Sequence, residues 1–422
     1  MRAIQPTVDF TALENQVRSV FTSAPIRHAD AIAGRKDQIR RLINAVLEDG
    51  KHAVLFGERG VGKTSVANTF HELIAGIDPS TIIPIRKQAF PYETFNDLWR
   101  KIFRDMKYEI NENGAYGRQI TTTVTASDIY PDEITSDDVV RELLRRPFKA
   151  SPVIIFDEFD LVTDDKTKAL MTHTLKAITE SSAGATVILV GIAKDVEALV
   201  AEHKSVDRIV SEIKMPRMSK DEMNEILDKR LPRLGFKLDG DARWKIIALA
   251  RGLPEYVHVL GRESALKAIE KCRVNIKEED VDQAINAFLQ DSDRSSYESY
   301  REATESNKPN ANYKKALLAC ALTKTSDEDA TFAPKDVLEP AALIFGGKVE
   351  IANFQSHINA FITPSRGTIL ERVGKERAYR YKFTDPKMQP YVIMRGIEEG
   401  TVTHDALSIL AAPEQPRLSS DF

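Results

Sequence analysis

One nine-residue stretch constrains the fold of this chain more than any other feature. The stretch from Gly57 to Ser65 reads GERGVGKTS and directly follows the apolar run HAVLF. It matches the pattern G-x-x-x-x-G-K-[ST], with Gly57, Gly62, Lys63 and Thr64 at the defined positions. Glycine costs backbone entropy and brings no side chain to bury, so three glycines here indicate a loop with special geometry. The sequence predicts a strand, a phosphate-binding loop and a helix, in that order.

This loop predicts the binding of a nucleoside triphosphate. Its backbone N–H groups can turn inward to form an anion nest, and the following helix adds the positive end of its dipole. We expect Lys63 to reach the β- and γ-phosphates and Thr64 to give its hydroxyl to Mg²⁺. The alternative is a glycine-rich turn that binds nothing. The predicted cofactors are therefore ATP and Mg²⁺, held by Gly57, Glu58, Arg59, Gly60, Val61, Gly62, Lys63, Thr64 and Ser65.

A second apolar run, VIIFDEFD, ends in the adjacent acids Asp157 and Glu158. In the phosphoryl-transfer template an acid at the end of such a strand orders Mg²⁺, and this role falls to Asp157. Glu158 would orient and polarise the attacking water. The alternative is a pair of solvated acids at the end of a strand. With the phosphate loop, the pair predicts hydrolysis of ATP as well as binding.

Composition limits the class of protein. The 422 residues exceed one ordinary core, so two or three domains are expected, and 42% hydrophobic with 29% charged residues is typical of globular proteins. A net charge of -4 excludes a generally basic coat but leaves room for a local basic face. Cys272 and Cys320 form no metal or disulfide spacing. Without a signal-peptide pattern or a long apolar run, we expect a cytoplasmic protein with no membrane partner.

The order of predicted elements divides the chain into domains. Residues 1–30 show little pattern and are expected to form an N-terminal arm. Apolar strands alternate with amphipathic helices over residues 31–215, which predicts a parallel sheet covered by helices on both faces, with a polar insertion or long loop at 108–137. Four consecutive helices over residues 216–290 predict a helical lid, which a polar linker at 291–311 follows.

A third domain is predicted over residues 312–398, before a tail at 399–422. Three helices followed by a two-stranded hairpin give the order of a winged helix-turn-helix. Basic groups on or beside the wing could neutralise DNA phosphates, although such domains also bind proteins. The predicted nucleic-acid contacts are Arg366, Arg372, Lys375, Arg377, Arg380 and Lys382.

Five motifs together resemble an AAA+ ATPase of the initiator-like group, which includes origin-recognition, helicase-loader and transposon-targeting ATPases. They are IAGRKDQI, HAVLFGERGVGKTS, VIIFDEFD, TVILVGIAKD and HKSVDRIVSEIKMPRMSKDEM, and the likeness covers roughly residues 31–290. It implies an α/β fold with a P-loop sheet between helices, an all-α lid and a C-terminal winged helix-turn-helix. It also implies a homo-oligomer in which Arg208 completes the catalytic set of Lys63 and Glu158 on a neighbouring subunit, while Arg35 contacts the nucleotide. Arg208 could equally be a surface arginine.

Two departures from this family affect the predicted activity. Gly191 ends a strand where relatives place a polar sensor of the γ-phosphate. The lid motif RGLPEYVHVLG has Glu255 where relatives often carry a basic sensor, although the basic residues Arg251, His258 and Arg262 are nearby. Hydrolysis is therefore expected to be slow or switch-like. The segment GLP also resembles the lid motif of STAND signalling ATPases, in which the proline, here Pro254, packs on adenine. The sequence predicts a nucleotide-controlled assembly switch on double-stranded DNA, with a STAND-type signalling or defence regulator that binds protein partners as the alternative.

Overall fold

The computed structural model divides the chain into two compact units. One unit is Ala24–Pro216, and the other combines Met1–Ser23 with Arg217–Phe422. We refer to them as the core unit and the lid unit. The structure describes residues 9–22, 26, 32–77, 82–113, 119–130, 132–145, 151–193, 196, 199, 208–307, 311–326, 329–375, 378–402 and 407.

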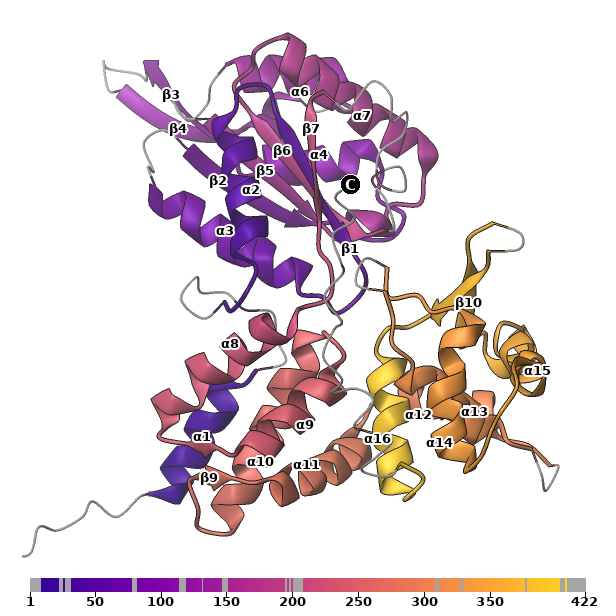
Figure 1. Ribbon diagram of the computed structural model, residues 1–422. Helices are drawn as coiled ribbons and strands as arrows, with labels where there is room; N and C mark the ends of the chain where they lie inside the picture. The colour runs from indigo at the N-terminus through magenta and orange to yellow at the C-terminus, as the bar shows by residue number, and fades with distance from the viewer. Residues whose placement is uncertain are drawn as a thin grey trace, which may run out of the picture. The chain divides into compact units, whose positions relative to one another are not determined.

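A parallel five-stranded sheet forms the centre of the core unit, as the sequence predicts (Figure 1). Its strand order is β2-β5-β6-β1-β7, and every neighbouring pair is parallel. The apolar runs form these strands because both faces of the sheet are covered and exclude water. The strands are β1 (His52–Gly57), β2 (Ile82–Gln88), β5 (Ser151–Asp157), β6 (Thr186–Ile192) and β7 (Val210–Lys214).

Helices cover both faces of this sheet (Figure 1). On one face lie α2 (Lys36–Leu47) and α3 (Lys63–Ile77). The other face packs against α4 (Phe95–Phe103), α6 (Ser136–Leu144) and α7 (Asp165–Glu180). This layered arrangement is the predicted P-loop fold.

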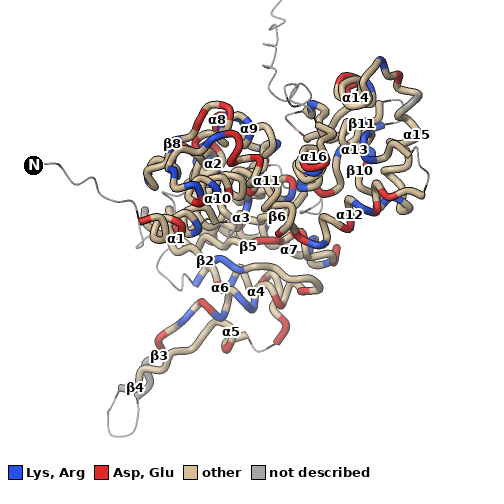
Figure 2. Tube along the Cα trace, turned by 90° about the horizontal axis from the view of Figure 1, so that it is seen from below, with Lys and Arg blue, Asp and Glu red and all other residues tan. Residues whose placement is uncertain are grey.

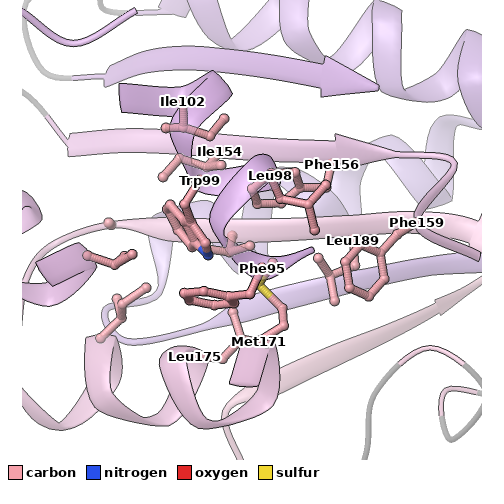
Figure 3. Packing of buried hydrophobic residues seen from close by; sticks show 14 of the residues in the cluster. Phe95, Leu98, Trp99, Ile102, Ile154, Phe156, Phe159, Met171, Leu175 and Leu189 are labelled. Atoms are coloured by element: carbon pink, nitrogen blue, oxygen red, sulfur yellow. The ribbon is translucent and has the colours of Figure 1, made fainter. Parts of the chain in front are cut away.

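The core under α4 is aromatic (Figure 3). The Trp99 ring lies edge-on to Phe156 of β5, with 5.5 Å between ring centroids, and Phe95 lies 6.2 Å from Trp99. All three side chains are buried, together with Met171 and Leu175 of α7. An edge-on aromatic pair stabilises the fold by about 0.5–1.5 kcal/mol beyond the contribution of the apolar area that it buries. This cluster therefore holds α4 on the strand that carries Asp157.

His52, the first residue of β1, joins three elements of the core. Its Nε2 lies 2.9 Å from the Leu175 carbonyl of α7, and its Nδ1 accepts a hydrogen bond from the Val187 amide of β6 at 3.0 Å. Burial lowers the pKa of His52 to about 4. The ring is therefore neutral near pH 7, with its proton on Nε2.

The polar stretch that the sequence assigns to an insertion or long loop contains an antiparallel hairpin of β3 (Lys107–Asn113) and β4 (Gln119–Thr125), followed by the short α5 (Ala126–Ile129). Figures 1 and 2 show the hairpin projecting from the core unit beyond α5. At its base the Tyr108 hydroxyl donates to the buried Glu142 carboxylate of α6. The segment is therefore a hairpin and not a long loop, because backbone hydrogen bonds between its two strands order it without an apolar face.

The lid unit contains the four helices predicted for the lid. They are α8 (Lys220–Arg230), α9 (Gly240–Ala250), α10 (Pro254–Glu270) and α11 (Glu278–Asp291), with a small parallel pair of β8 (Lys237–Leu238) and β9 (Asn275–Ile276). Ser219 and Glu222 form the predicted capping box at the start of α8. No helix in the described part of the chain is both long and apolar enough to cross a membrane.

Two predicted connecting segments contain helices that pack on their surroundings. Residues 1–30 include α1 (Phe10–Val20), which contacts α10, and a Cβ at Gly261 of α10 would lie 2.9 Å from the Phe21 ring. The predicted linker includes α12 (Arg294–Thr304), whose Tyr300 is buried. The helix α12 agrees with a linker that is partly helical, whereas α1 differs from the predicted arm because buried side chains, such as Val17 and Phe21, hold it on a larger body.

The C-terminal part has the element order predicted for a winged helix. Three helices, α13 (Tyr313–Leu322), α14 (Leu338–Phe345) and α15 (Ile351–Phe361), precede an antiparallel hairpin of β10 (Leu370–Val373) and β11 (Arg380–Phe383). A bridge between Phe332 and Tyr381 adds a third extended segment beside the hairpin. The closing helix α16 (Met388–Glu398) packs against α13 and α11.

Candidate nucleotide-binding site

The predicted phosphate loop joins the end of β1 to the start of α3, and its glycines have backbone geometry that other residues rarely adopt. Gly60 and Gly62 have φ values of 83° and 94°, in the left-handed region that favours glycine. At Gly57 a Cβ would lie 2.4 Å from the Met215 carbonyl oxygen, so the approach of the next segment also requires glycine. The loop thus has the shape of an anion nest at a helix N-terminus.

Lys63 is folded back over this loop. Its Nζ donates to the Gly57 carbonyl at 3.0 Å and to the Glu58 carbonyl at 2.7 Å. Burial lowers the pKa of Lys63 to about 8, while the nearby carboxylates of Asp160 and Asp157 act in the opposite direction. The ammonium group therefore lies close to the predicted catalytic acids, in a place where phosphate oxygens could replace the two carbonyls.

Other predicted contacts support the loop from its flanks. Arg35, buried and with φ of 65°, donates from Nη2 to the Val61 carbonyl at 2.9 Å. The Ser65 hydroxyl accepts a hydrogen bond from the Ile26 amide at 3.1 Å. Thr64 is half-buried in the first turn of α3. The structure thus brings Arg35 and Ser65 to the loop, and each of them holds backbone in this arrangement.

The two predicted acids lie at the carboxyl edge of the sheet, and both contact the neighbouring strand β2. Asp157, only 2% exposed, forms an ion pair with Arg86, and the Gln88 side-chain amide donates to the Glu158 carboxylate. The parallel register places Gln88 beside Asp157. Glu158 has a left-handed backbone with φ of 56°, which turns the chain away from the sheet directly after β5.

Arg86 and Gln88 are site residues that sequence reasoning missed. They lie on β2, and their relation to the acids depends on β2 and β5 being neighbours in the sheet. One signal was available: parallel strands of one sheet end at the same edge, so polar residues at the end of IIPIRKQ are candidates for contact with the acids.

The residues of this site fit a magnesium nucleotide. A lysine and a nest of backbone N–H groups suit phosphate, and a hydroxyl at Thr64 with a carboxylate at Asp157 suits Mg²⁺. The described residues contain no group of three or more His, Cys, Asp or Glu side chains that could hold a metal ion. Mg²⁺ in such sites takes one or two protein oxygens, with phosphate and water completing its shell, so a larger cluster is not required.

Gly191, the departure at the end of β6, has a physical reason in the structure. A Cβ at this position would lie 2.8 Å from Leu199 Cδ2 and 2.9 Å from Asp160 Oδ1. The Asp160 carboxylate also accepts a hydrogen bond from the Ile192 amide at 2.8 Å. The turn after Glu158 therefore occupies the space that a polar sensor side chain would need.

Two further predicted site residues belong to other elements of the described chain. Arg208 is exposed on the turn before β7, away from the strand interior. Pro254 is the first residue of α10 and belongs to the lid unit. The roles of Arg208 on a neighbouring subunit and of Pro254 against adenine stay predictions.

The six predicted nucleic-acid contacts differ in what they touch. Arg366 stacks over the Tyr313 ring at 3.8 Å, Lys382 pairs with Glu371 at 3.0 Å, and Arg380 donates to the Thr331 hydroxyl and carbonyl at 2.6 and 2.9 Å.

Two of the six are exposed on the hairpin, where Figure 2 shows basic residues. Arg372 lies 4.2 Å from the centroid of the Tyr379 ring, and Lys375 follows on the turn. Arg377 lies outside the described residues. Arg372 and Lys375 are therefore the described members of the set best placed to meet a phosphate.

Comparisons with known proteins agree with the site. Residues 46–200 match a family model described as AAA domain, and no curated protein matches the chain. Among solved structures, the chain is similar to the Orc1 protein of Aeropyrum pernix in complex with DNA, with 19% identity, 90% of this chain and 93% of that chain covered, and a TM-score of 0.46.

Two further solved structures are similar to the chain. The Walker-type ATPase paby2304 of Pyrococcus abyssi has 17% identity, 89% and 99% coverage and a TM-score of 0.49. Cdc6p of Pyrobaculum aerophilum has 18% identity, 91% and 98% coverage and a TM-score of 0.43. The matched family model spans the phosphate loop, Asp157 and Glu158. Residues 46–200 of this chain are therefore an AAA domain, and the resemblance to AAA+ ATPases predicted from the motifs is confirmed.

Proposed function

We propose that this protein binds and hydrolyses ATP and uses the nucleotide to control its own assembly on double-stranded DNA. The observation that carries the proposal is the convergence of Lys63 and the acids Asp157 and Glu158 at one edge of a P-loop sheet. Lys63 and the loop amides would hold the phosphates, and Thr64 with Asp157 would hold Mg²⁺. Glu158 would accept a proton from the attacking water.

Bound Mg²⁺ would supply charge neutralisation at the β- and γ-phosphates, and the chain's own residues would do the rest. Arg86 and Gln88 already engage both acids, so these contacts compete with a cation at Asp157 and with a water at Glu158. This restraint supports slow turnover in the isolated protein. The crowding at Gly191 also supports slow turnover, because it disfavours a side chain that could sense the γ-phosphate there.

The DNA part of the proposal rests on the C-terminal hairpin. Its exposed Arg372 and Lys375 extend from a three-helix body with the element order of a winged helix. Lys and Arg side chains that neutralise phosphates supply salt-dependent affinity for duplex DNA. The net charge of -4 makes such a local basic face necessary for DNA binding, because the chain as a whole repels phosphate.

Two variants test the nucleotide site. Lys63→Ala should abolish ATP binding in isothermal titration calorimetry, since it removes the cation that meets the phosphates. Glu158→Gln should bind ATP with unchanged affinity and lose at least about a hundredfold in turnover, within the range of general base catalysis. Lys166→Ala, an exposed position on α7, is the matched control and should change neither quantity. Equal turnover of wild type and Glu158→Gln would remove Glu158 from the mechanism.

A further inference from the structure

The lid motif contains the second departure from the family, and the structure shows what its residues contact. We call residues 251–256 the lid turn; it connects α9 to the first turn of α10. Arg251 donates from Nη2 to the Thr323 carbonyl at 2.8 Å, directly after α13. Glu255 forms an ion pair with Lys387 at 2.7 Å, and the Tyr256 hydroxyl donates to the Lys387 carbonyl at 2.8 Å. Three side chains of the lid turn thus contact the C-terminal domain.

Arg217, the first residue after the core unit, completes this contact. Its Nη1 donates to the Arg251 carbonyl at 3.3 Å and to the Gln389 side-chain oxygen at 2.6 Å. Gln389 is 1% exposed, and its Nε2 donates to the Ala321 carbonyl at 3.0 Å. A Cβ at Gly252 would lie 2.7 Å from Arg217 Cβ, so the close approach of the two segments depends on glycine.

These contacts bury polar groups in a bonded network, which is costly to break. A buried donor or acceptor that loses its partner costs about 1–3 kcal/mol, and more when the group is charged. Burial and the neighbouring Arg217 charge lower the pKa of Arg251 to about 9, yet the guanidinium is held by a carbonyl. Glu255 carries a negative charge, which would repel a γ-phosphate and attracts Lys387 instead.

We propose that the lid turn is a docking site for the C-terminal domain of the same chain, and that Arg251 and Glu255 transmit the nucleotide state to that domain instead of sensing the γ-phosphate. The proposal rests on the proposed function in one respect, because nucleotide must change the lid for a signal to exist. In this arrangement the lid and the C-terminal domain move together, and DNA affinity follows the nucleotide.

A short covalent path joins the phosphate loop to this docking site. Met215 belongs to the core unit, where its amide donates to the Phe56 carbonyl at 2.7 Å and its carbonyl lies against Gly57. Arg217, two residues further on, already bonds to Gln389. Only Pro216 separates Met215, which contacts the phosphate loop, from Arg217, which bonds to the C-terminal domain. A shift of Met215 when phosphate binds can therefore reach the hydrogen bond between Arg217 and Gln389.

The test compares nucleotide affinity, DNA affinity and hydrogen exchange in the full chain. The variants are Arg217→Ala, Gln389→Ala and Glu255→Lys, and Arg233→Ala, an exposed arginine of the same unit, is the control. A non-hydrolysable ATP analogue and a fluorescent duplex are the probes. We expect the analogue to change the duplex Kd of wild type and control by about 5- to 150-fold, the usual range of coupling between sites.

In Arg217→Ala, Gln389→Ala and Glu255→Lys we expect the analogue to change the duplex Kd by less than about twofold. The Kd of the analogue itself should stay within about twofold of wild type. Glu255→Lys combined with Lys387→Glu should restore the dependence, since the ion pair is rebuilt with reversed charges. Amide exchange of residues 313–323 and 388–396 should respond to the analogue in wild type, in the control and in the double variant, and should not respond in the three single variants.

The outcomes separate this proposal from the proposed function. A change of more than tenfold in analogue Kd for Glu255→Lys would mean that Glu255 contacts nucleotide, and the docking role would be overturned. Full nucleotide dependence of DNA affinity in Arg217→Ala and Gln389→Ala would overturn it as well. If wild type binds no duplex in any state, the DNA function fails, and hydrogen exchange and analogue affinity still decide whether the lid turn transmits the nucleotide state.

Discussion

At the scale of single residues, the site holds its acids through side chains of the neighbouring strand. Gln88 donates to the Glu158 carboxylate, and Arg86 pairs with Asp157. A carboxylate oxygen that accepts an amide hydrogen has one fewer lone pair for the proton of an attacking water. The amide at Gln88 therefore restrains the residue proposed as general base, and its removal has a predictable direction.

We predict that Gln88→Ala raises the basal rate of ATP hydrolysis by about two- to tenfold, because one net hydrogen bond of about 0.5–1.5 kcal/mol no longer competes for Glu158. Nucleotide affinity should stay unchanged, since Gln88 contacts neither the loop nor Lys63 among the bonds that the structure shows. Single-turnover kinetics would measure the rate. Gln283→Ala, at an exposed position of α11, is the control, and a rate of Gln88→Ala below wild type would mean that the amide positions Glu158 for catalysis.

Lys63 gives a prediction for pH. Its pKa is lowered to about 8 by burial, and phosphate groups at the loop would favour the charged form and raise that pKa. ATP binding above pH 8 must then take up a proton, so affinity should be flat between about pH 7 and 7.5. It should fall by up to about tenfold per pH unit above 8.

The control for this titration is Lys63→Arg, whose guanidinium stays charged over the whole range. Its affinity should be lower than that of wild type and independent of pH. Calorimetry in buffers of different ionisation enthalpy would count the proton directly. Loss of affinity below pH 7.5, or the same slope in Lys63→Arg, would assign the titration to another group.

The sequence predicts the acids and the loop because each lies within one short motif. Arg86 and Gln88 could not be assigned in this way, since their partners lie far along the chain and the strand order is set by packing of the whole sheet. The space at Gly191 was also hidden. Only the structure shows that Leu199 and Asp160 crowd a side chain at this position.

At the scale of elements, apolar runs predict the strands β1, β2, β5 and β6 of the central sheet, and helical patterns predict the four lid helices. The last strand, β7, is not an apolar run, and only the likeness to the family indicates it. Two elements were missed. The helix α1 has Leu13, Val17 and Phe21 on one face at helical spacing, a signal that the interpretation of residues 1–30 as an arm with little pattern overlooked. The β3–β4 hairpin was missed for another reason. The segment TTTVT is almost entirely threonine, so it lacks the alternation of apolar and polar residues that marks a half-buried strand, and only the backbone pairing with β3 identifies it.

The hairpin of β10 and β11 carries a prediction about DNA. Replacing the exposed Arg372 and Lys375 by alanine should weaken duplex binding about equally for all sequences, because phosphates carry no sequence information. The slope of log affinity against log salt should fall by about 0.9 for each phosphate that the variant no longer neutralises. Stability should change by no more than about 0.5 kcal/mol, as is usual for exposed positions.

Arg380→Ala is the matched comparison on the same hairpin. Arg380 bonds to the Thr331 hydroxyl and carbonyl, so its loss should reduce stability, as urea unfolding would measure, and should leave the salt slope unchanged. The predicted phosphate role of Arg380 would return if its loss changed the slope as much as Arg372→Ala does. Absence of any duplex affinity in wild type at low salt would favour a domain that binds proteins, as in the signalling alternative.

At the scale of the whole molecule, the question is whether one chain contains a complete catalytic set. The described core unit brings Lys63 and both acids together, while Arg208 lies exposed on the turn before β7. An arginine that stabilises the charge on a transferred phosphoryl group can come from another subunit and adds about 10³–10⁵ in rate in the best-studied cases. Exposure of Arg208 is what a residue acting on a neighbour requires.

We predict that activity per chain rises with protein concentration and that Arg208→Ala binds ATP normally but loses turnover.

Mixing Arg208→Ala with Glu158→Gln should then restore activity, because one kind of interface pairs an intact arginine with an intact acid. For random dimers of an equal mixture, half of the assemblies contain both chains, and each of these has one complete site. Restored activity should therefore approach a quarter of the wild-type rate per chain, measured by phosphate release at saturating ATP. Arg233→Ala mixed with Glu158→Gln is the control and should give about half of the wild-type rate per chain, because half of the chains keep Glu158 and every partner supplies Arg208. If the Arg208→Ala mixture stays inactive and protein concentration has no effect on wild-type activity per chain, Arg208 acts within its own chain or not at all. Assembly would then not be needed to complete the active site.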